Sequence, residues 1–265
     1  MIIIKSNGYN GQIVSPTMFP DGTSQVWKLD LESMGSNVTI VWYFEQEAEL
    51  IWINQLIALM YQSKKVVDEL YIPYLPYGRQ DKEISNMTTF AKIIFLEILL
   101  KEHVGKVTSL DAHSYHESVQ SYSPNTYIEK AIGEFKPDCL VFPDKGAYER
   151  YSKDYKEFSC IVLDKVRDQL TGNITGMQID SNLSDVIGSD EYYKLLIIDD
   201  ICDGGKTFET ASILLHSKFD CDVGLFVTHG IFSKGFNRLI ESGISNFYTT
   251  QSRPDMINGY LLTEV

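Results

Sequence analysis

An isoleucine-rich run that ends in two adjacent aspartates constrains this chain more than any other stretch. The residues from Leu195 to Ile198 are all apolar, which predicts a strand buried on both faces, and Asp199 and Asp200 close it. A loop of small residues follows, and the apolar spacing from Phe208 to Lys218 predicts a helix. Strand, glycine loop and helix N-terminus together form an anion site, because free backbone N–H groups and the helix dipole face the loop.

The acidic pair limits which ligands this anion site could bind. Carboxylates repel phosphate, so Asp199 and Asp200 are expected to face ribose hydroxyls or a hydrated Mg²⁺. The combination predicts a sugar phosphate whose phosphate lies in the loop. An ATP-binding P-loop is rejected, because that motif requires a glycine where Asp200 stands. An ordinary strand-to-helix turn with solvated acids remains open from these residues alone.

Composition excludes several classes of protein. The 23 basic and 36 acidic residues of the 265-residue chain give a net charge of −13 without a basic block, which argues against a nucleic-acid partner. The four cysteines lack paired metal spacing and are interpreted as buried thiols in a reducing compartment. Met1–Ile4 is too short for a signal peptide, and the apolar run 90–100 carries two charges, so we expect a cytoplasmic protein without a membrane span.

Strand-like and helix-like segments alternate along most of the chain. This alternation predicts an α/β fold with parallel sheets and helices on both faces. The stretch Pro124–Pro137 resembles a junction, so we expect two domains, 1–132 and 133–265. Ligands of such sheets bind at the carboxyl ends of the strands. The expected strands are Val38–Phe44, Glu69–Pro73, Val107–Ala112, Cys139–Pro143, Cys160–Asp164, Leu195–Asp200 and Val223–His229, and the other expected helices are Glu49–Gln62, Thr88–His103 and Ser233–Ser242.

Polar residues follow two strands of the first domain. Arg79, Gln80 and Asp81 stand on a stiff, proline-rich and aromatic loop, where Arg79 can clamp a phosphate and its neighbours can read a base edge or ribose. A turn with a surface salt bridge is the alternative. His113 ends the next strand, where a histidine can serve as metal ligand, acid or base, or charge stabiliser, although a structural role is also common. Zinc is not favoured, because only His116 lies nearby.

Two further clusters follow strands of the second domain. Asp144 suits a Mg²⁺ or sugar-hydroxyl contact, and equally a helix N-cap. Lys165 and Arg167 stand at the root of the tract Gln169–Gly188, which is rich in Gly, Ser, Asn and Asp. That pattern predicts a lid that closes on phosphates, and the alternative is a surface β-hairpin with two solvated cations. An early turn, Phe19–Thr23, is a weaker signal.

Together these motifs resemble the ribose-phosphate diphosphokinase family, the phosphoribosyl pyrophosphate synthetases. The similarity runs from Phe19 to about Pro254. Six segments in the same order carry it: Tyr71–Asp81, Asp111–His113, Phe142–Gly146, Asp164–Arg167, Leu196–Thr207, and Thr228–Gly230 with Ser233.

The resemblance implies two phosphoribosyltransferase-type domains with an active site between them, usually in a homo-oligomer. It implies Mg²⁺-dependent transfer of the β,γ-diphosphoryl group of ATP to the anomeric hydroxyl of a ribose phosphate, releasing AMP. The implied roles are ATP binding by Phe19, Asp21, Arg79, Gln80 and Asp81; metal and group-transfer contacts by His113 and Asp144; charge neutralisation by Lys165 and Arg167; and sugar-phosphate binding by Asp199, Asp200, Asp203, Gly204, Gly205, Lys206 and Thr207, with Asp200 also counted as catalytic.

The chain departs from the family's pattern at the sugar-phosphate loop. The family usually has Asp-Thr-x-Gly-Thr there, whereas this chain places Gly204 at the hydroxyl position and adds Lys206. A hypothesis follows that the acceptor carries a substituent on its phosphate, as ADP-ribose does, since a phosphodiester needs fewer donors. Thr23 also replaces the family's usual glutamate beside Phe19 and Asp21, which puts adenine recognition by that turn in question.

Two other functional classes share parts of the pattern. A phosphoribosyltransferase shares the acidic-pair loop, but it does not explain the Arg79 or Lys165 clusters. A non-catalytic, family-like regulatory subunit should have lost His113 or the cations of the tract after Asp164, which this chain retains. Both classes are therefore ranked below the kinase-type enzyme.

Overall fold

The computed structural model describes the whole chain except residues 81–82, 84, 101–102, 168–173, 186–187, 189–190, 255–261 and 265. The chain divides into two compact units, Met1–Ser123 and Pro124–Val265. The division falls at the start of the stretch interpreted as a junction. Most of that stretch forms helix α3 (Asn125–Phe135), which buries Ile128, Ala131 and Phe135 in a core of the second unit.

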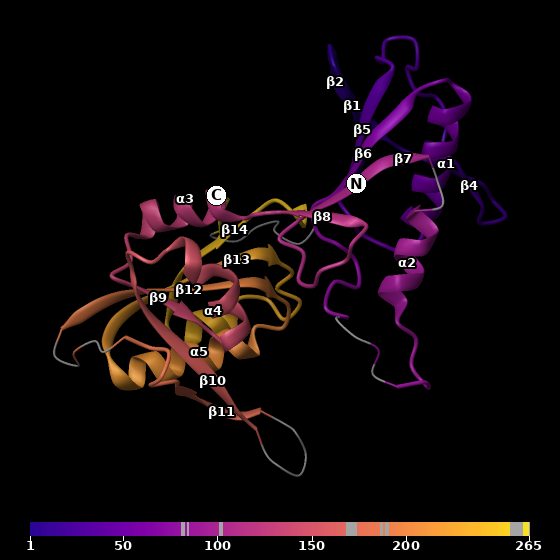
Figure 1. Cartoon of the computed structure of the whole chain (residues 1–265). Helices are drawn as coiled ribbons and strands as arrows, with labels where there is room; N and C mark the ends of the chain where they lie inside the picture. The colour runs from indigo at the N-terminus through magenta and orange to yellow at the C-terminus, as the bar shows by residue number, and fades with distance from the viewer. Residues whose placement is uncertain are drawn as a thin grey trace. The chain divides into compact units, whose positions relative to one another are not determined.

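A six-stranded sheet forms the first unit, in the order β2-β1-β5-β6-β7-β8. Strands β5 (Asn37–Trp42), β6 (Val66–Ile72), β7 (Val104–Leu110) and β8 (Val119–Tyr122) run parallel to one another. Strand β1 (Ile2–Ser6) pairs antiparallel with β5 and with β2 (Tyr9–Val14), a hairpin that the sequence analysis did not anticipate. Helices α1 (Glu49–Gln62) and α2 (Ala91–Leu100) lie alongside this sheet (Figure 1).

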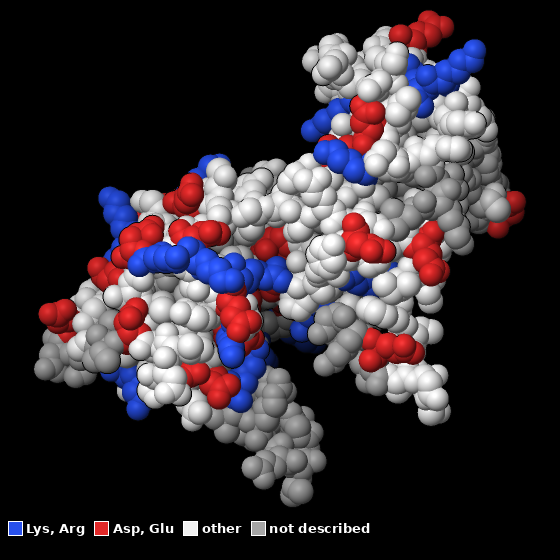
Figure 2. Space-filling model, viewed as in Figure 1, with Lys and Arg blue, Asp and Glu red and all other residues white. Residues whose placement is uncertain are grey.

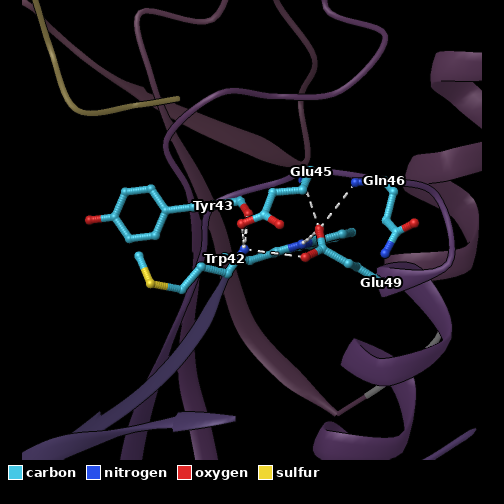
Figure 3. Close-up of polar contacts among 6 residues, drawn as sticks. Trp42, Tyr43, Glu45, Gln46 and Glu49 are labelled. Carbon is cyan, nitrogen blue, oxygen red and sulfur yellow. Dashed lines mark hydrogen bonds and ion pairs between the residues drawn. The ribbon is translucent and has the colours of Figure 1, made fainter. Parts of the chain in front are cut away.

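A buried carboxylate organises the loop between β5 and α1. One oxygen of Glu49, Oε2, accepts hydrogen bonds from the indole Nε1 of Trp42 at 2.9 Å and from the backbone N–H groups of Glu45 at 2.7 Å and Gln46 at 3.4 Å (Figure 3). Glu49 is 2% exposed and Trp42 is fully buried, so these bonds replace the water that both groups lose on folding. The backbone that carries Glu47 is thereby held in one conformation.

A seven-stranded sheet forms the second unit, in the order β11-β10-β9-β12-β13-β14-β15. Its strands β9 (Cys139–Phe142), β10 (Ser159–Arg167), β12 (Tyr192–Cys202), β13 (Asp220–Gly230), β14 (Ile244–Thr249) and β15 (Leu262–Glu264) are parallel, whereas β11 (Ile174–Ile179) pairs antiparallel with β10. The helices are α3, α4 (Lys145–Tyr151), α5 (Lys206–Lys218) and α6 (Asn237–Glu241), with a short 3₁₀ turn at Ser152–Asp154 (Figure 1).

Strand β12 is buried on both faces, as its isoleucine-rich sequence predicts. Leu195 and Ile197 belong to a core that includes residues of α5, whereas Leu196 and Ile198 belong to a core that includes residues of α3 and α4. Successive strand residues point to opposite faces, so an uninterrupted apolar run is needed to serve both cores. The predicted α/β class with parallel sheets and helices is confirmed.

Several expected boundaries shift. Strand β12 does not end at the acidic pair but continues to Cys202, because Ile201 and Cys202 remain paired with β13. Helix α5 begins at Lys206 rather than at Phe208. The expected helix Ser233–Ser242 is shorter: Phe232 and Gly235 have positive φ angles of 46° and 70°, and α6 starts at Asn237.

The expected core helix around Phe90–Leu100 is α2, which buries Phe95, Leu96 and Leu99. Among the described residues, no helix combines the length and the apolar character needed to cross a membrane. Three cysteines are buried free thiols and Cys160 is partly buried. Burial raises the pKa of the Cys139 thiol to about 12, which keeps it protonated at neutral pH.

Candidate active site

Two adjacent loops at the carboxyl ends of β6 and β7 bring together predicted residues of the first unit. Ile72 pairs with Ser109, and the backbone N–H of Leu110 donates to Pro73 O at 3.2 Å, so the loops that follow start side by side. One loop carries Arg79, which is exposed, and Gln80, which is partly buried; the other carries His113, which is exposed. Asp81 lies outside the described residues.

The loop of Arg79 has an imposed shape. Tyr77 adopts a positive φ of 57°, and its hydroxyl donates a hydrogen bond to Glu47 in the loop that Glu49 organises. The hydrogen bond to Glu47, together with partial burial, raises the pKa of Tyr77 to about 12. Backbone bonds from Gly78 N to Leu75 O and from Gln80 N to Tyr77 O close successive turns. Arg79 is therefore presented from a fixed backbone, as the prolines and glycine indicate.

The early turn lies in the two-stranded ribbon of β3 (Thr17–Met18) and β4 (Ser24–Gln25). Asp21 Oδ1 accepts from Thr23 N at 3.0 Å and from Thr23 Oγ1 at 2.7 Å, and these bonds lower the pKa of Asp21. Phe19 stacks edge to face with Trp27, with ring centroids 6.2 Å apart. Thr23, the residue that departs from the family pattern, is thus engaged with Asp21.

In the second unit, Asp144 and Lys165 form an ion pair at the carboxyl ends of β9 and β10. Asp144 is the N-cap of α4: its Oδ1 accepts from Ala147 N at 3.0 Å, and its Oδ2 lies 2.6 Å from Lys165 Nζ. Burial acts to raise the pKa of Asp144, but the hydrogen bonds from Lys165 and Ala147 outweigh burial and hold it below its ordinary value. Both roles predicted for Asp144, cap and acidic ligand, remain compatible.

The tract after Lys165 is the hairpin that was the alternative to a lid. Strand β10 extends through Arg167 and pairs with β11, with Lys165 opposite Met177 and Arg167 opposite Ile174. Residues 168–173 at its tip lie outside the described residues, as do the contacts of the Arg167 side chain. Lys165 is not a solvated surface cation, because its side chain is 21% exposed and bound to Asp144.

The acidic pair lies within β12, close to Asp144. Burial, followed by the charges of Asp200 and Asp144, raises the pKa of Asp199 well above its ordinary value. Asp200 is 4% exposed, and its Oδ2 lies 3.8 Å from a guanidinium nitrogen of Arg150 on α4. Two of these three neighbouring carboxylates, Asp144 and Asp200, therefore pair with a cation, Lys165 and Arg150 respectively. Sequence reasoning missed Arg150, whose only sequence signal is its place in the helix that Asp144 caps.

The predicted phosphate loop comprises Asp203, Gly204 and Gly205 followed by the first turn of α5, which contains Lys206 and Thr207. Gly205 has a φ of 77°, and a Cβ there would lie 3.1 Å from Leu239 Cδ2, so glycine is required. Asp203 Oδ1 accepts from Ser233 Oγ at 2.6 Å. The first N–H groups of α5 have no acceptor within the helix, which suits them to an anion.

Lys206 is exposed, whereas Gly204 lies next to Lys234. Lys206 is 73% exposed and its Nζ lies 3.0 Å from Glu209 Oε1, and the nearest atom to a Cβ built on Gly204 is Lys234 Cγ at 3.6 Å. On the face drawn in Figure 2, basic and acidic side chains of the described residues are interspersed over both units. The cations near the candidate site, Lys165 on β10 and Arg150 on α4, therefore act as single local groups.

The two units have parallel-rich α/β folds, and the chain as a whole shares its fold with a phosphoribosylpyrophosphate synthetase. Among solved structures, phosphoribosylpyrophosphate synthetase from Mycobacterium smegmatis matches with a TM-score of 0.74 at 19% identity, over 96% of this chain and 85% of that one. No family model matches the chain.

Curated relatives carry the same family name. The ribose-phosphate pyrophosphokinase of Sulfolobus acidocaldarius is 26% identical over 260 residues, covering 94% of this chain and 87% of the relative. Those of Bradyrhizobium diazoefficiens and Aquifex aeolicus are 25% and 27% identical, and the matches span 58% and 60% of their lengths. The chain is therefore similar to ribose-phosphate pyrophosphokinases over nearly its whole length.

Proposed function

We propose that the protein transfers the β,γ-diphosphoryl group of ATP to the anomeric hydroxyl of ribose 5-phosphate and releases AMP. The observation that carries the proposal is in the second unit: an acidic pair lies close to the Asp144–Lys165 ion pair and is followed by a glycine loop at the N-terminus of α5. The names of the curated relatives, ribose-phosphate pyrophosphokinases, support the reaction type. As the family resemblance implies, the proposal includes a cytoplasmic homo-oligomer.

In this proposal the second unit binds the sugar phosphate. The loop Asp203–Gly205 and the first turn of α5 donate N–H groups to the 5-phosphate. Asp199 and Asp200 accept hydrogen bonds from ribose hydroxyls, and a cation arriving with the substrate relieves the repulsion that raises the pKa of Asp199. Lys165 and Arg167 neutralise charge that develops on the transferring group.

The first unit binds ATP. Arg79 clamps phosphate oxygens, and Gln80, Asp81, Phe19 and Asp21 hold the nucleoside. His113, exposed on the adjacent loop, contacts the transferring group. The turn at Tyr77 is already held by the hydrogen bond to Glu47, so the loop of Arg79 need not become ordered when ATP binds. This lowers the entropic cost of positioning Arg79 on the phosphates.

Mg²⁺ fits the donor set of the site. Within the described part of the chain, no three His, Cys, Asp or Glu residues gather as a metal cluster. Mg²⁺ commonly binds through one or two carboxylates together with substrate phosphates, and Asp144, whose lowered pKa keeps it ionised, supplies such an oxygen. We assign Asp144 and His113 as the residues that face the metal. Bound Mg²⁺ would supply charge neutralisation and orientation of the phosphates.

A second candidate acceptor is ADP-ribose, and the sugar-phosphate loop favours considering it. Gly204 has no side chain to crowd a substituent on the 5-phosphate, and the exposed Lys206 amine can bind a second phosphate. The names of the relatives support ribose 5-phosphate instead, so that acceptor is the primary proposal.

The test is turnover of ATP with Mg²⁺ and each acceptor, followed by quantification of AMP and mass spectrometry of the sugar product. The proposal predicts AMP in equal amount to a sugar that has gained a diphosphate. Lys165→Met should lower kcat about 10²–10³-fold, whereas Lys153→Met, an exposed lysine near the same sheet, should not change it. If the wild type released no more AMP with either acceptor than without one, the result would contradict the proposal and favour a non-catalytic subunit. Consumption of a ribosyl diphosphate without ATP would favour a phosphoribosyltransferase.

A further inference from the structure

Lys92 on α2 is buried in the first unit and lies between the two candidate nucleotide loops. The residue is 2% exposed, which is rare for lysine unless its amine is hydrogen bonded. Its Nζ donates to Ser114 Oγ at 2.6 Å and to Ser114 O at 3.2 Å. Ser114 directly follows His113, so this amine is anchored to the loop after β7.

The same contacts reach the loop of Arg79. Ser114 Oγ donates onward to Gly78 O at 3.0 Å, so the chain Lys92 Nζ, Ser114 Oγ, Gly78 O joins the helix to both loops. The backbone N–H of Lys92 donates to Gln80 Oε1 at 3.2 Å. This N–H belongs to the first turn of α2, where no intrahelical acceptor exists, so Gln80 caps the helix from the nucleotide loop.

We propose that Lys92 is a positioning residue that sets the spacing between the Arg79–Gln80 loop and the His113 loop, an inference that rests on the proposed function for its effect on ATP. Lys92 does not touch substrate in this account. Its amine acts through Ser114 and Gly78, whose backbone positions determine where the exposed Arg79 and His113 point, and its backbone N–H holds the Gln80 side chain. A buried polar network of this kind favours one arrangement, because each hydrogen bond restrains the groups that make the next one.

Lys65 offers a matched control in the same unit. Its Nζ also makes two hydrogen bonds, here to the carbonyl oxygens of Met34 at 2.7 Å and Gly35 at 3.2 Å. Lys65 stands at the amino end of β6, however, which is the opposite end from the candidate loops. Lys65→Met and Lys92→Met each remove one hydrogen-bonded amine and retain a long apolar side chain. A difference between them in nucleotide binding therefore reports position and not general loss of stability.

The experiment measures the Kd of a non-hydrolysable ATP analogue, the KM for ATP and for the acceptor, and amide hydrogen exchange in residues 74–80 and 112–116. Lys92→Met should weaken analogue binding and raise the KM for ATP about tenfold, with the acceptor KM unchanged and faster exchange in both loops. Lys65→Met should leave analogue binding and exchange in both loops as in the wild type.

Ser114→Ala tests the link without removing the amine. It deletes the hydroxyl between Lys92 and Gly78 and should weaken analogue binding about threefold, and the double variant should bind no worse than Lys92→Met alone. Ser114→Ala decides the matter if Lys92→Met does not fold. Equal analogue affinity in the wild type and these variants, or equal losses in Lys92→Met and Lys65→Met, would overturn the inference. A wild type that binds no analogue would instead contradict the proposed function, and exchange in the two loops would still test the bridge.

Discussion

Lys165 Nζ lies 2.6 Å from Asp144 Oδ2, which joins strand β10 to the N-cap of α4 at the carboxyl edge of the second sheet. In the proposed function, a substrate phosphate would compete with Asp144 for the Lys165 amine, and the ion pair would hold Lys165 in place until that anion binds. The hydrogen bond from Lys165 also lowers the pKa of Asp144 and so helps to keep this carboxylate ionised. The ion pair should therefore make the stability of the second unit depend on pH in acid.

Asp144→Asn should change how stability depends on pH. The pKa of Asp144 is lowered on folding, so its ionised form contributes stability above the ordinary carboxyl pKa of about 4, and that contribution is lost as pH falls through the folded pKa. Urea unfolding between pH 7 and pH 2 should show the wild type losing more stability below pH 4 than Asp144→Asn. Parallel curves would show that the ion pair does not lower this pKa.

Asp199→Asn should change the pH dependence of stability in the opposite direction from Asp144→Asn. Burial and the nearby carboxylates raise the pKa of Asp199, so ionisation costs stability as pH rises from about 4 through the folded pKa. At neutral pH the free energy of unfolding of the variant should exceed that of the wild type by about 1 kcal/mol, and this difference should vanish in acid. Sugar-phosphate binding should weaken at the same time, measured by the acceptor KM. A destabilised variant at pH 7 would contradict the raised pKa.

Gly205→Ala should destabilise the second unit and weaken the acceptor site. The backbone there has a φ of 77°, and the added Cβ would press on Leu239, so a loss of about 1–3 kcal/mol in the free energy of unfolding is expected. Gly204→Ala is the matched control, because the nearest atom to its Cβ lies 3.6 Å away. Chemical denaturation of both variants tests the difference, and equal losses would show that the loop does not depend on the left-handed residue.

Glu49→Ala should destabilise the first unit, because it leaves the Trp42 indole and two backbone N–H groups without their acceptor (Figure 3). The expected cost is about 1–3 kcal/mol in the free energy of unfolding. Glu45→Ala, in which the side chain removed is 42% exposed, should cost less than about 1 kcal/mol. Trp fluorescence during urea unfolding measures both, and a small effect at Glu49 would show that water replaces its carboxylate.

Elements with a clear local residue pattern could be predicted from the sequence. The apolar run in β12, the periodicity of α1 and the polar residues after β6, β7 and β9 all anticipate observed elements. The pattern places the end of β12 too early, because Ile201 and Cys202 stay in the strand only through their pairing with β13. Arg150 and Lys92 were missed for a similar reason. Each owes its place near the candidate site to contacts with residues distant in sequence, and neither belongs to a local motif that marks it.

The most direct test follows a phosphorus label. With ATP labelled at the β-phosphorus, Mg²⁺ and ribose 5-phosphate, our account predicts that the label moves to the sugar product together with the γ-phosphoryl group, leaving unlabelled AMP. Label that stays in ADP would indicate transfer of a single phosphoryl group. Label that stays in ATP with either acceptor would show that the protein does not catalyse diphosphoryl transfer, and either result would contradict the account.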